Sequence, residues 1–242
     1  LQTPESLKER YNLDVRVFTE VLSIYTVDKK VSVKNLQTGE IYLENYDKLL
    51  LSPGAEPIKP PFEGIDSDKI YTLRNIPDMD KIVAKTKNAQ NFVVVGGGFI
   101  GLEVAENLIE AGKSVKLVEL GNQVMAPVDF DIASFLHEKA KQKGLELLLN
   151  VGVEKFNDKG EIIEVFLNNG TSLETDAVIL AIGVKPETKL AVEAGLEIGE
   201  TRGILVNEFL QTSNPDIYAV GDAIEVAHFI NNKKVLIPLA WP

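Results

Sequence analysis

Short apolar runs bounded by glycine, proline or asparagine recur along the chain, and between some of them the apolar positions repeat at helical spacing. The runs predict buried strands, because a strand covered on both faces is apolar at successive positions. The helical spacing predicts amphipathic helices. In the middle of the chain the two patterns alternate, with expected strands at 92–95, 114–118 and 145–149 and expected helices at 102–112 and 130–142. This alternation indicates an α/β fold with a parallel sheet.

Antiparallel segments are expected on both sides of this central region. A second meander is predicted over residues 153–173, because Asn168-Asn169-Gly170 is a hairpin turn signal. The chain ends with a predicted hairpin around Asn231-Asn232. The first meander is expected to contain four short strands, at residues 13–18, 21–27, 30–36 and 41–43.

One strand–turn–helix segment carries candidate chemistry. Gly96, Gly98 and Gly101 follow the strand at 92–95 in the spacing G-x-G-x-x-G. The first glycine permits a tight turn, the second leaves the backbone open to a pyrophosphate, and the third lets the helix pack closely on the strands. The helix N-terminus offers N–H groups and a partial positive charge to phosphates.

An acidic residue stands where this type of site needs one. Glu119 ends the next expected strand, 18 residues after Gly101, and a carboxylate there accepts hydrogen bonds from the adenosine ribose. Because it would repel a 2′-phosphate, the pattern favours NAD over NADP. A purely structural β–α turn is the alternative, but the order of strand, glycines, helix, strand and acid favours dinucleotide binding.

Composition narrows the classes of function. The formal net charge of −11, with no Lys/Arg cluster, argues against nucleic-acid binding. No apolar run approaches the ~18 residues that span a membrane, and no signal peptide opens the chain, so we expect a cytoplasmic protein. The chain has no cysteine and two histidines, His137 and His228, so neither a metal site nor a catalytic residue is predicted in it. We interpret His137 as a surface or boundary residue, and the chain, which lacks an initiator methionine, as a piece of a longer protein.

Four segments together resemble the pyridine nucleotide–disulfide oxidoreductase superfamily: VVVGGGFIGLEVAENL, SVKLVE, DAVILAIGVKPET and NPDIYAVGDA. The run KLLLSPGAEP, with QVMAPVD and IPLAWP, is similar to the branch that holds coenzyme A disulfide reductases, NADH-dependent persulfide reductases and NADH oxidases. The resemblance covers essentially the whole chain. It implies a Rossmann-like NAD-binding domain at 87–202, inserted in a partial FAD-binding domain made of residues 1–86 and 203–242.

The resemblance also implies two sets of cofactor-binding residues. In the FAD set, Asp222 would bind the ribitol chain, and Arg74, Leu239 and Ala240 are weaker matches to flavin-contacting positions. In the NAD set, Phe99 would cover the flavin until nicotinamide arrives, and Glu103 matches an acidic position facing the flavin–nicotinamide junction. The remaining implied FAD contacts are Ser52, Pro53, Gly54 and Ala55, and the NAD contacts are Gly96, Gly98, Phe99, Ile100, Gly101, Glu119 and Gly183.

Three parts of the family pattern are absent from this chain: the amino-terminal FAD fingerprint, the redox-active cysteine and the carboxyl-terminal dimerisation domain. The resemblance implies an FAD-dependent oxidoreductase that passes hydride from NADH to flavin and on to a disulfide or persulfide such as coenzyme A disulfide. The whole protein is expected to be a homodimer and this fragment to be inactive alone. An NADH oxidase that reduces oxygen or peroxide, or a non-catalytic nucleotide-binding module, are the alternatives.

Overall fold

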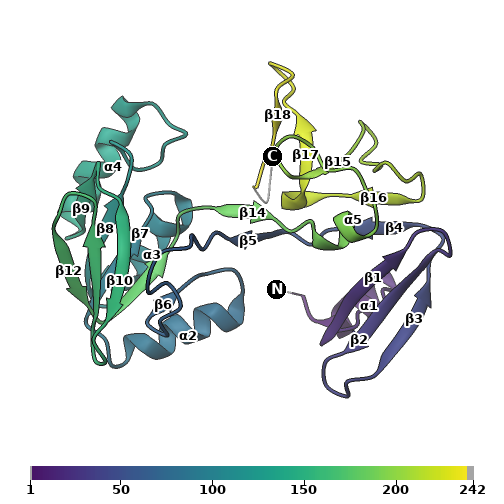
Figure 1. Ribbon diagram of the computed structural model, residues 1–242, viewed down its shortest axis with the longest axis horizontal. Coiled ribbons are helices and arrows are strands. Elements are labelled where there is room, and N and C mark those ends of the chain that lie inside the picture. Colours follow the sequence, from purple (N-terminus) through teal and green to yellow (C-terminus); the bar gives the residue numbers. More distant parts are fainter. Residues whose placement is uncertain (1, 239–242) are drawn as a thin grey trace. The chain divides into compact units, whose positions relative to one another are not determined.

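The computed structural model describes residues 2–238, and its elements fall into two compact units (Figure 1). Unit 1 comprises the chain up to Ala55 and from Pro186 onward, and unit 2 is Glu56–Lys185. The two connecting segments, β5 (Ala55–Pro57) and β14 (Val184–Pro186), pair as a two-stranded sheet. Unit 2 is therefore an insertion within the sequence of unit 1.

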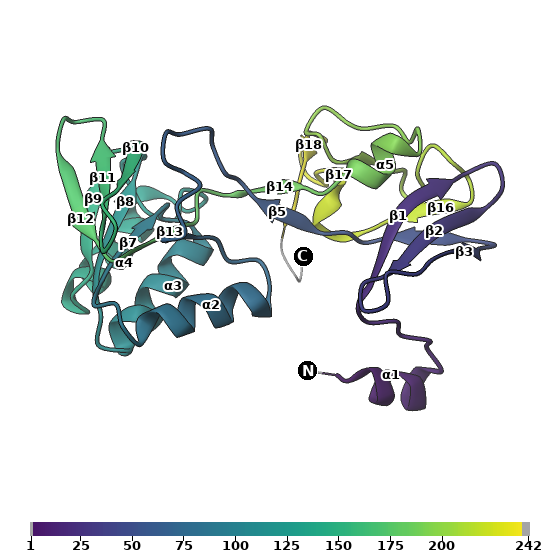
Figure 2. The same ribbon diagram turned by 60° about the horizontal axis from the view of Figure 1, so that its bottom comes forward.

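Unit 2 is built around a five-stranded parallel sheet with the strand order β6-β13-β7-β8-β9. Figure 2 shows helices α2 and α3 on one side of this sheet. The antiparallel meander β10-β11-β12 packs on its other face. The sheet strands are β6 (Ile70–Tyr71), β7 (Asn91–Val95), β8 (Ser114–Glu119), β9 (Glu146–Leu149) and β13 (Ala177–Leu180). The other elements are α2 (Ile76–Thr86), α3 (Phe99–Glu110), α4 (Phe130–Gln142), β10 (Val153–Asp158), β11 (Ile163–Leu167) and β12 (Ser172–Thr175).

Strand β7 shows why successive apolar residues are needed in the sheet. Phe92 and Val94 join the core under the helices, whereas Val93 and Val95 join the core under the meander. All four are at most 5% exposed, so both faces of the strand are dry. Burying each such side chain contributes roughly 1.5–3 kcal/mol. The α/β fold with a parallel sheet that the sequence predicts is confirmed.

Unit 1 consists of small sheets around a second core. Strands β1, β2 and β3 form an antiparallel meander, β4 pairs in parallel with β16, and β17 lies between β15 and β18. The strands are β1 (Thr19–Tyr25), β2 (Lys30–Asn35), β3 (Ile41–Asn45), β4 (Leu49–Leu51), β15 (Ile204–Leu205), β16 (Ile217–Ala219), β17 (Ile224–Ala227) and β18 (Lys234–Val235). The helices are α1 (Pro4–Tyr11), α5 (Lys189–Glu193) and the short 3-10 helix η1 (Gly221–Ala223).

The strand predicted at residues 13–18 is wrong. The structure gives this segment no regular element, and β1 begins only at Thr19. Phe18 has a φ of +52°, a left-handed conformation that interrupts an extended backbone. Leu13 and Val17 are 49% and 57% exposed, so the apolar alternation that suggested a strand has no core behind it.

The compact units divide after Ala55 and after Lys185, whereas the cofactor-binding domains expected at 1–86, 87–202 and 203–242 stay a prediction. The structure groups residues 56–86 with the glycine motif, because β6 pairs with β13 and Ile82 of α2 lies in the same core as Phe92. It groups residues 186–202 with unit 1, because Ala191 of α5 lies in that core. Which cofactor each unit binds remains a prediction.

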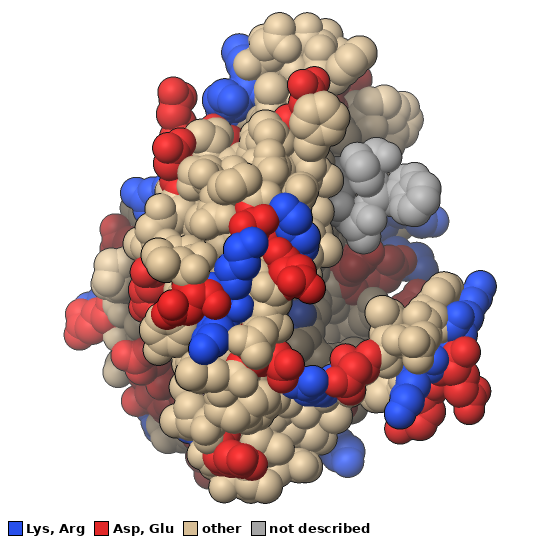
Figure 3. Space-filling view, turned by 90° about the vertical axis from the view of Figure 1, so that its right-hand side faces the viewer, with Lys and Arg blue, Asp and Glu red and all other residues tan. Residues whose placement is uncertain are grey.

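Surface charges in unit 1 are arranged in opposite-sign groups. The carboxylate of Asp216 pairs with the ammonium groups of Lys29 and Lys48, and these two contacts lower the pKa of Asp216. Figure 3 shows Lys and Arg side chains beside Asp and Glu on this face.

In the described part of the chain, no helix has the length and apolarity to cross a bilayer. The same residues contain no group of His, Cys, Asp or Glu side chains arranged to hold a metal ion.

A surface carboxylate in unit 2 joins the meander to the loop before β6. Asp158 accepts a hydrogen bond of 2.5 Å from the Ser67 hydroxyl and one of 2.9 Å from the Lys69 ammonium. These bonds, with a further one from the Gly160 N–H, lower the pKa of Asp158 from 3.8 to about 2. Because the folded-state pKa is below the unfolded one, these contacts stabilise the fold above about pH 3.8 and lose that effect as the pH falls toward 2.

Asp158→Asn should therefore lower the melting temperature at pH 7, and the difference from the wild type should shrink between pH 4 and pH 2. Asp68→Asn is the matched control, since Asp68 is 91% exposed and lies 3.4 Å from the Lys69 ammonium. It should change little at any pH, because exposed ion pairs contribute little. A melting difference for Asp158→Asn that stays constant across this pH range would contradict the assignment.

Candidate dinucleotide-binding site

The order of strands in unit 2 reverses at β7. After β7 the chain builds β8 and β9 on one side, whereas β13 lies on the other side of β7. The carboxyl ends of β7 and β13 lie next to each other, since Val95 pairs with Leu180 and the Ala181 N–H donates to the Val95 carbonyl over 2.8 Å. In open α/β sheets, ligands bind outside the strand ends at such a reversal.

The glycine turn begins at the end of β7 and fits tightly against β13. Gly96 has a φ of +107°, and a Cβ there would overlap the carbonyl oxygen of Ala181. A Cβ on Gly101 would overlap the carbonyl oxygen of Gly96, so α3 packs on the turn only because this residue has no side chain. A Cβ on Gly98, in contrast, would have no atom within 4 Å. The turn therefore has no room for a side chain at Gly96 or Gly101, whereas Gly98 faces open space.

The open glycine is also the N-cap of α3. Its side-chain position is empty, so no side chain caps the helix, and the first turn has no acidic residue. The first N–H groups of a helix have no partner within the helix, and they carry a partial positive charge. Phe99 and Ile100, in that first turn, are 54% and 37% exposed. Open space beside uncapped N–H groups fits a diphosphate.

The carboxylate of Glu119 lies directly beside this turn. Its Oε2 accepts a 2.6 Å hydrogen bond from the Gly97 N–H, and its Oε1 accepts a 2.7 Å bond from the Gly121 N–H. A Cβ on Gly97 would lie 2.9 Å from Val124 Cγ1 and 3.1 Å from Oε2, so there is little room for a side chain between Gly96 and Gly98. Each carboxylate oxygen has further lone pairs, which leaves acceptors for two ribose hydroxyls. The two backbone donors fix the orientation of the carboxylate.

The loop after β8 is joined to the same turn. The Met125 N–H donates to the Gly97 carbonyl over 2.8 Å, and the Val124 N–H donates to His137 Nε2 over 3.1 Å. His137, half-buried on α4, thus holds the loop that borders the glycine turn. The sequence pattern predicts a surface or boundary histidine, and it contains no signal for the hydrogen bond to Val124.

Unit 2 also contains three other residues that the resemblance implies: Gly183, Glu103 and Arg74. Gly183 follows β13 with a φ of +116° and is exposed, so it borders the same sheet edge as Gly96. Glu103 is exposed on α3, one turn after Phe99. Arg74 is exposed between β6 and α2, and its backbone N–H donates to Asp78. The structure thus brings Gly183 to the glycine turn's edge of the sheet, whereas Arg74 belongs to the segment that leads into α2.

A second candidate site lies in unit 1, again where parallel strands end. Residues 52–55 follow β4, and Asp222 follows β16, its parallel neighbour. The Val220 N–H donates to the Leu51 carbonyl over 2.9 Å, which brings the two exits together. Gly54 and Gly221 have φ values of +74° and +77°, with no atom within 4 Å of a Cβ. The predicted residues Ser52, Pro53, Gly54, Ala55 and Asp222 therefore share one sheet edge, while Leu239 and Ala240 lie outside the described residues.

The fold and the glycine turn together define a class, the dinucleotide-binding α/β proteins. A family model described as pyridine nucleotide-disulphide oxidoreductase matches residues 2–238. The chain belongs to this family, and the family expected from the sequence motifs is confirmed.

Three known proteins show how far the similarity extends. An NADH oxidase of Methanocaldococcus jannaschii is 37% identical over 98% of this chain and 53% of its own length. A coenzyme A disulfide reductase of Staphylococcus haemolyticus is 33% identical over 99% of this chain and 53% of its own length. The crystal structure of reduced Bacillus anthracis CoADR-RHD superposes with a TM-score of 0.96 at 47% identity, covering 100% of this chain and 44% of that one. The chain thus spans about half the length of the curated relatives it matches.

Proposed function

We propose that this chain binds NADH and is the pyridine-nucleotide portion of an FAD-dependent oxidoreductase. The whole protein would pass hydride from NADH to flavin and then reduce a small disulfide or persulfide such as coenzyme A disulfide. The observation that carries the proposal is the open Gly98 at the start of α3, next to the oriented carboxylate of Glu119. Family membership and the relative named coenzyme A disulfide reductase support it.

The residues of unit 2 would bind and orient the nucleotide. The N–H groups of the first α3 turn would donate to the diphosphate, and Glu119 would accept from the adenosine ribose while repelling a 2′-phosphate. Phe99 and Ile100, exposed in that turn, would contact the nicotinamide half, and Gly183 would let the backbone approach it. Burial of the nucleotide against this sheet edge would exclude water from the side of the ring that faces the protein.

The residues of unit 1 would hold FAD, whose isoalloxazine ring supplies the hydride acceptor. Residues 52–55 offer backbone groups at a glycine turn, and Asp222 offers a carboxylate to the ribitol hydroxyls. Arg74, Leu239 and Ala240 are proposed to contact the flavin by resemblance alone. The described residues fit such a group because a Cβ on Gly54 or Gly221 would meet no atom within 4 Å, and Gly221 is the neighbour of Asp222 in the sequence.

The electron acceptor depends on residues that this chain does not contain. Reduction of a disulfide or persulfide requires a cysteine, and the chain has none, so the thiol would come from another part of the whole protein. The NADH oxidase from Methanocaldococcus jannaschii, at 37% identity, favours oxygen or peroxide as a second candidate acceptor. We propose that the whole protein is a cytoplasmic homodimer.

The test of the proposed function uses the full-length protein under anaerobic conditions. It should purify yellow, lose its colour on addition of NADH, and regain the colour with coenzyme A disulfide. Colour that returns only with oxygen would favour the NADH oxidase. A colourless protein that binds NAD without reducing anything would contradict the enzyme and favour a nucleotide-binding module.

The 242-residue chain alone should bind NADH but retain little FAD and show no turnover. The glycine turn and Glu119 are both present, whereas the family's amino-terminal FAD fingerprint is absent from this sequence. Fluorescence titration with NADH and flavin absorbance of the purified chain measure the two parts separately. Stoichiometric FAD in the purified chain would contradict the second part.

A further inference from the structure

The imidazole of His137 is the acceptor that fixes the loop after β8, residues 121–128. Because the Val124 N–H donates to its Nε2 over 3.1 Å, this nitrogen carries a lone pair and the imidazole is neutral. Val124 is fully buried, in the core that lies under the helices. A buried N–H without an acceptor is costly, so the position of Val124 depends on the bond to His137.

The same loop supports the glycine turn. A Cβ on Gly97 would lie 2.9 Å from Val124 Cγ1, and the next residue, Met125, donates its N–H to the Gly97 carbonyl over 2.8 Å. Met125 has a φ of +52°, a left-handed conformation that is unfavourable for a residue with a side chain. Hydrogen bonds from two successive N–H groups therefore maintain a strained backbone beside the turn.

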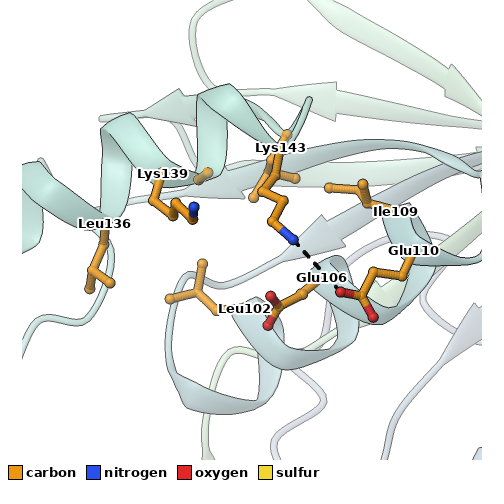
Figure 4. Close-up of a pocket in the computed structure, with 9 residues that line it drawn as sticks. Leu102, Glu106, Ile109, Glu110, Leu136, Lys139 and Lys143 are labelled. Atoms are coloured by element: carbon orange, nitrogen blue, oxygen red, sulfur yellow. Dashed lines mark ion pairs between the residues drawn. The ribbon is translucent and has the colours of Figure 1, made fainter.

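Helix α4, which carries His137, is anchored to helix α3. Figure 4 shows Leu136 and Lys143 of α4 facing side chains of α3, and the Lys143 ammonium lies 3.8 Å from a Glu110 carboxylate oxygen. Ala140 of α4 packs on the core that α3 also joins. Because α3 begins at the glycine turn, the contacts form a closed path from α3 through α4 and His137 to the loop, and from the loop back to the turn.

Protonation of His137 would break this path. A protonated imidazole has an N–H on both nitrogens and no lone pair, so it cannot accept from the Val124 N–H. Two donors would then face each other, and the buried N–H of Val124 would have lost its acceptor. Histidine changes charge between about pH 5 and pH 8, so the loop should lose its support within this range.

The charged groups around the imidazole lie on one side of it. Glu138 and Lys141 of α4 and Glu146 of β9 line, with His137, a hollow of about 450 Å³. The ring is half-buried there, so solvent protons can reach it. Phe130 meets the ring edge-on, with 6.3 Å between the ring centroids, and brings no charge. The loop has no ionisable side chain, so a change in charge at this contact comes from the histidine.

We propose that His137 is a positioning residue of the nucleotide site and makes nucleotide affinity depend on pH. The neutral imidazole holds Val124 and Met125 against the glycine turn, and the turn then binds the diphosphate with full affinity. The protonated imidazole releases Val124, the turn loses this support, and affinity falls at acidic pH. This inference rests on the proposed binding of NADH at Gly98 and Glu119.

Titration calorimetry of the full-length flavoprotein with ADP-ribose tests the inference. ADP-ribose keeps the diphosphate and the adenosine ribose of NADH, but it cannot reduce the flavin. Measurements at about pH 8 and about pH 5.5 lie near the two ends of the range in which an imidazole changes charge. Wild-type affinity should fall by about threefold to tenfold at the lower pH, the effect expected from the loss of one hydrogen bond.

Two substitutions of the histidine separate its charge from its lone pair. His137→Gln keeps an acceptor, the amide oxygen, that does not titrate in this range, so its affinity should match the wild type at the higher pH and stay nearly constant at the lower one. His137→Leu has no acceptor, so its affinity should be low at both. Thermal melting at each pH shows whether the variants are folded.

His228→Gln is the matched control. His228 also accepts a backbone N–H, from Ile230 over 3.3 Å, but it lies in the turn between β17 and β18 of unit 1. This variant should keep the wild-type pH dependence. A wild-type affinity that does not change with pH, or a change that persists in full in His137→Gln, would overturn the inference and leave nucleotide binding intact. ADP-ribose that binds at neither pH would contradict the proposed nucleotide site itself, and the inference with it.

Discussion

Gly96→Ala should destabilise unit 2 by about 2–4 kcal/mol, a large effect for a single added methyl group. Two costs coincide at this position. The φ of +107° is strained for any residue with a Cβ, and that Cβ would overlap the carbonyl oxygen of Ala181 at the end of β13. Relief would require β7 and β13 to separate, although Ala181 and Val95 are hydrogen-bonded there. Thermal or urea unfolding of the variant measures the effect.

Gly98→Ala is the matched control for this substitution. Gly98 has a φ of −79°, and an added Cβ would have no neighbour within 4 Å, so the fold should keep its stability. The same methyl group would occupy the space left for the diphosphate, so NADH binding should weaken. If Gly96→Ala melted like the wild type, the turn would not be as closely fitted to β13 as the structure shows.

Glu119→Arg should weaken NADH binding and favour NADPH relative to NADH, each by on the order of 1–3 kcal/mol. The substitution removes the acceptor for the ribose hydroxyls and places a cation where a 2′-phosphate would lie. It also leaves the N–H groups of Gly97 and Gly121 without the carboxylate that accepts from them. Parallel titrations with both nucleotides measure the change.

Glu119→Gln separates the charge from the hydrogen bonds. The amide keeps one oxygen acceptor, so NADH affinity should fall less than in Glu119→Arg, and NADPH should gain less. Melting curves show whether either variant disturbs the turn. Unchanged titration curves for both nucleotides in Glu119→Arg would contradict the assignment of Glu119 as a ribose-binding residue.

The sequence pattern predicts the centre of unit 2 well because local and long-range requirements agree there. The run at 92–95 is apolar at every position, and β7 is buried on both faces. The glycine spacing implies a closed turn, and Gly96 and Gly101 do meet backbone oxygens where a side chain would be. A periodic helix and a terminal acid follow in the order that the βαβ motif requires.

Other features depend on contacts that a linear pattern does not contain. Residues 13–18 alternate like a strand but find no partner, and Phe18 adopts a left-handed conformation instead. The β5–β14 pair joins residues 55–57 to residues 184–186, which are far apart in the sequence. The divisions between the units follow the pairing of β6 with β13, whose residues are far apart in the sequence.

The sequence pattern likewise does not predict the hydrogen bonds within the candidate site. Glu119 stands out in the sequence because of its distance from Gly101, yet its bonds to Gly97 and Gly121 depend on how the loop after β8 folds back. His137 contributes to that loop through Val124, a contact between residues on different elements. The assignments to FAD rest on the resemblance, and the structure adds that residues 52–55 and Asp222 share one sheet edge.

A crystal structure of the protein with NADH would test the central claim most directly. We predict diphosphate oxygens within hydrogen-bond distance of the N–H groups at the start of α3, over the open face of Gly98, and the adenosine ribose on the carboxylate of Glu119. Density for the nucleotide at another place, with side chains filling the space above Gly98, would contradict the account.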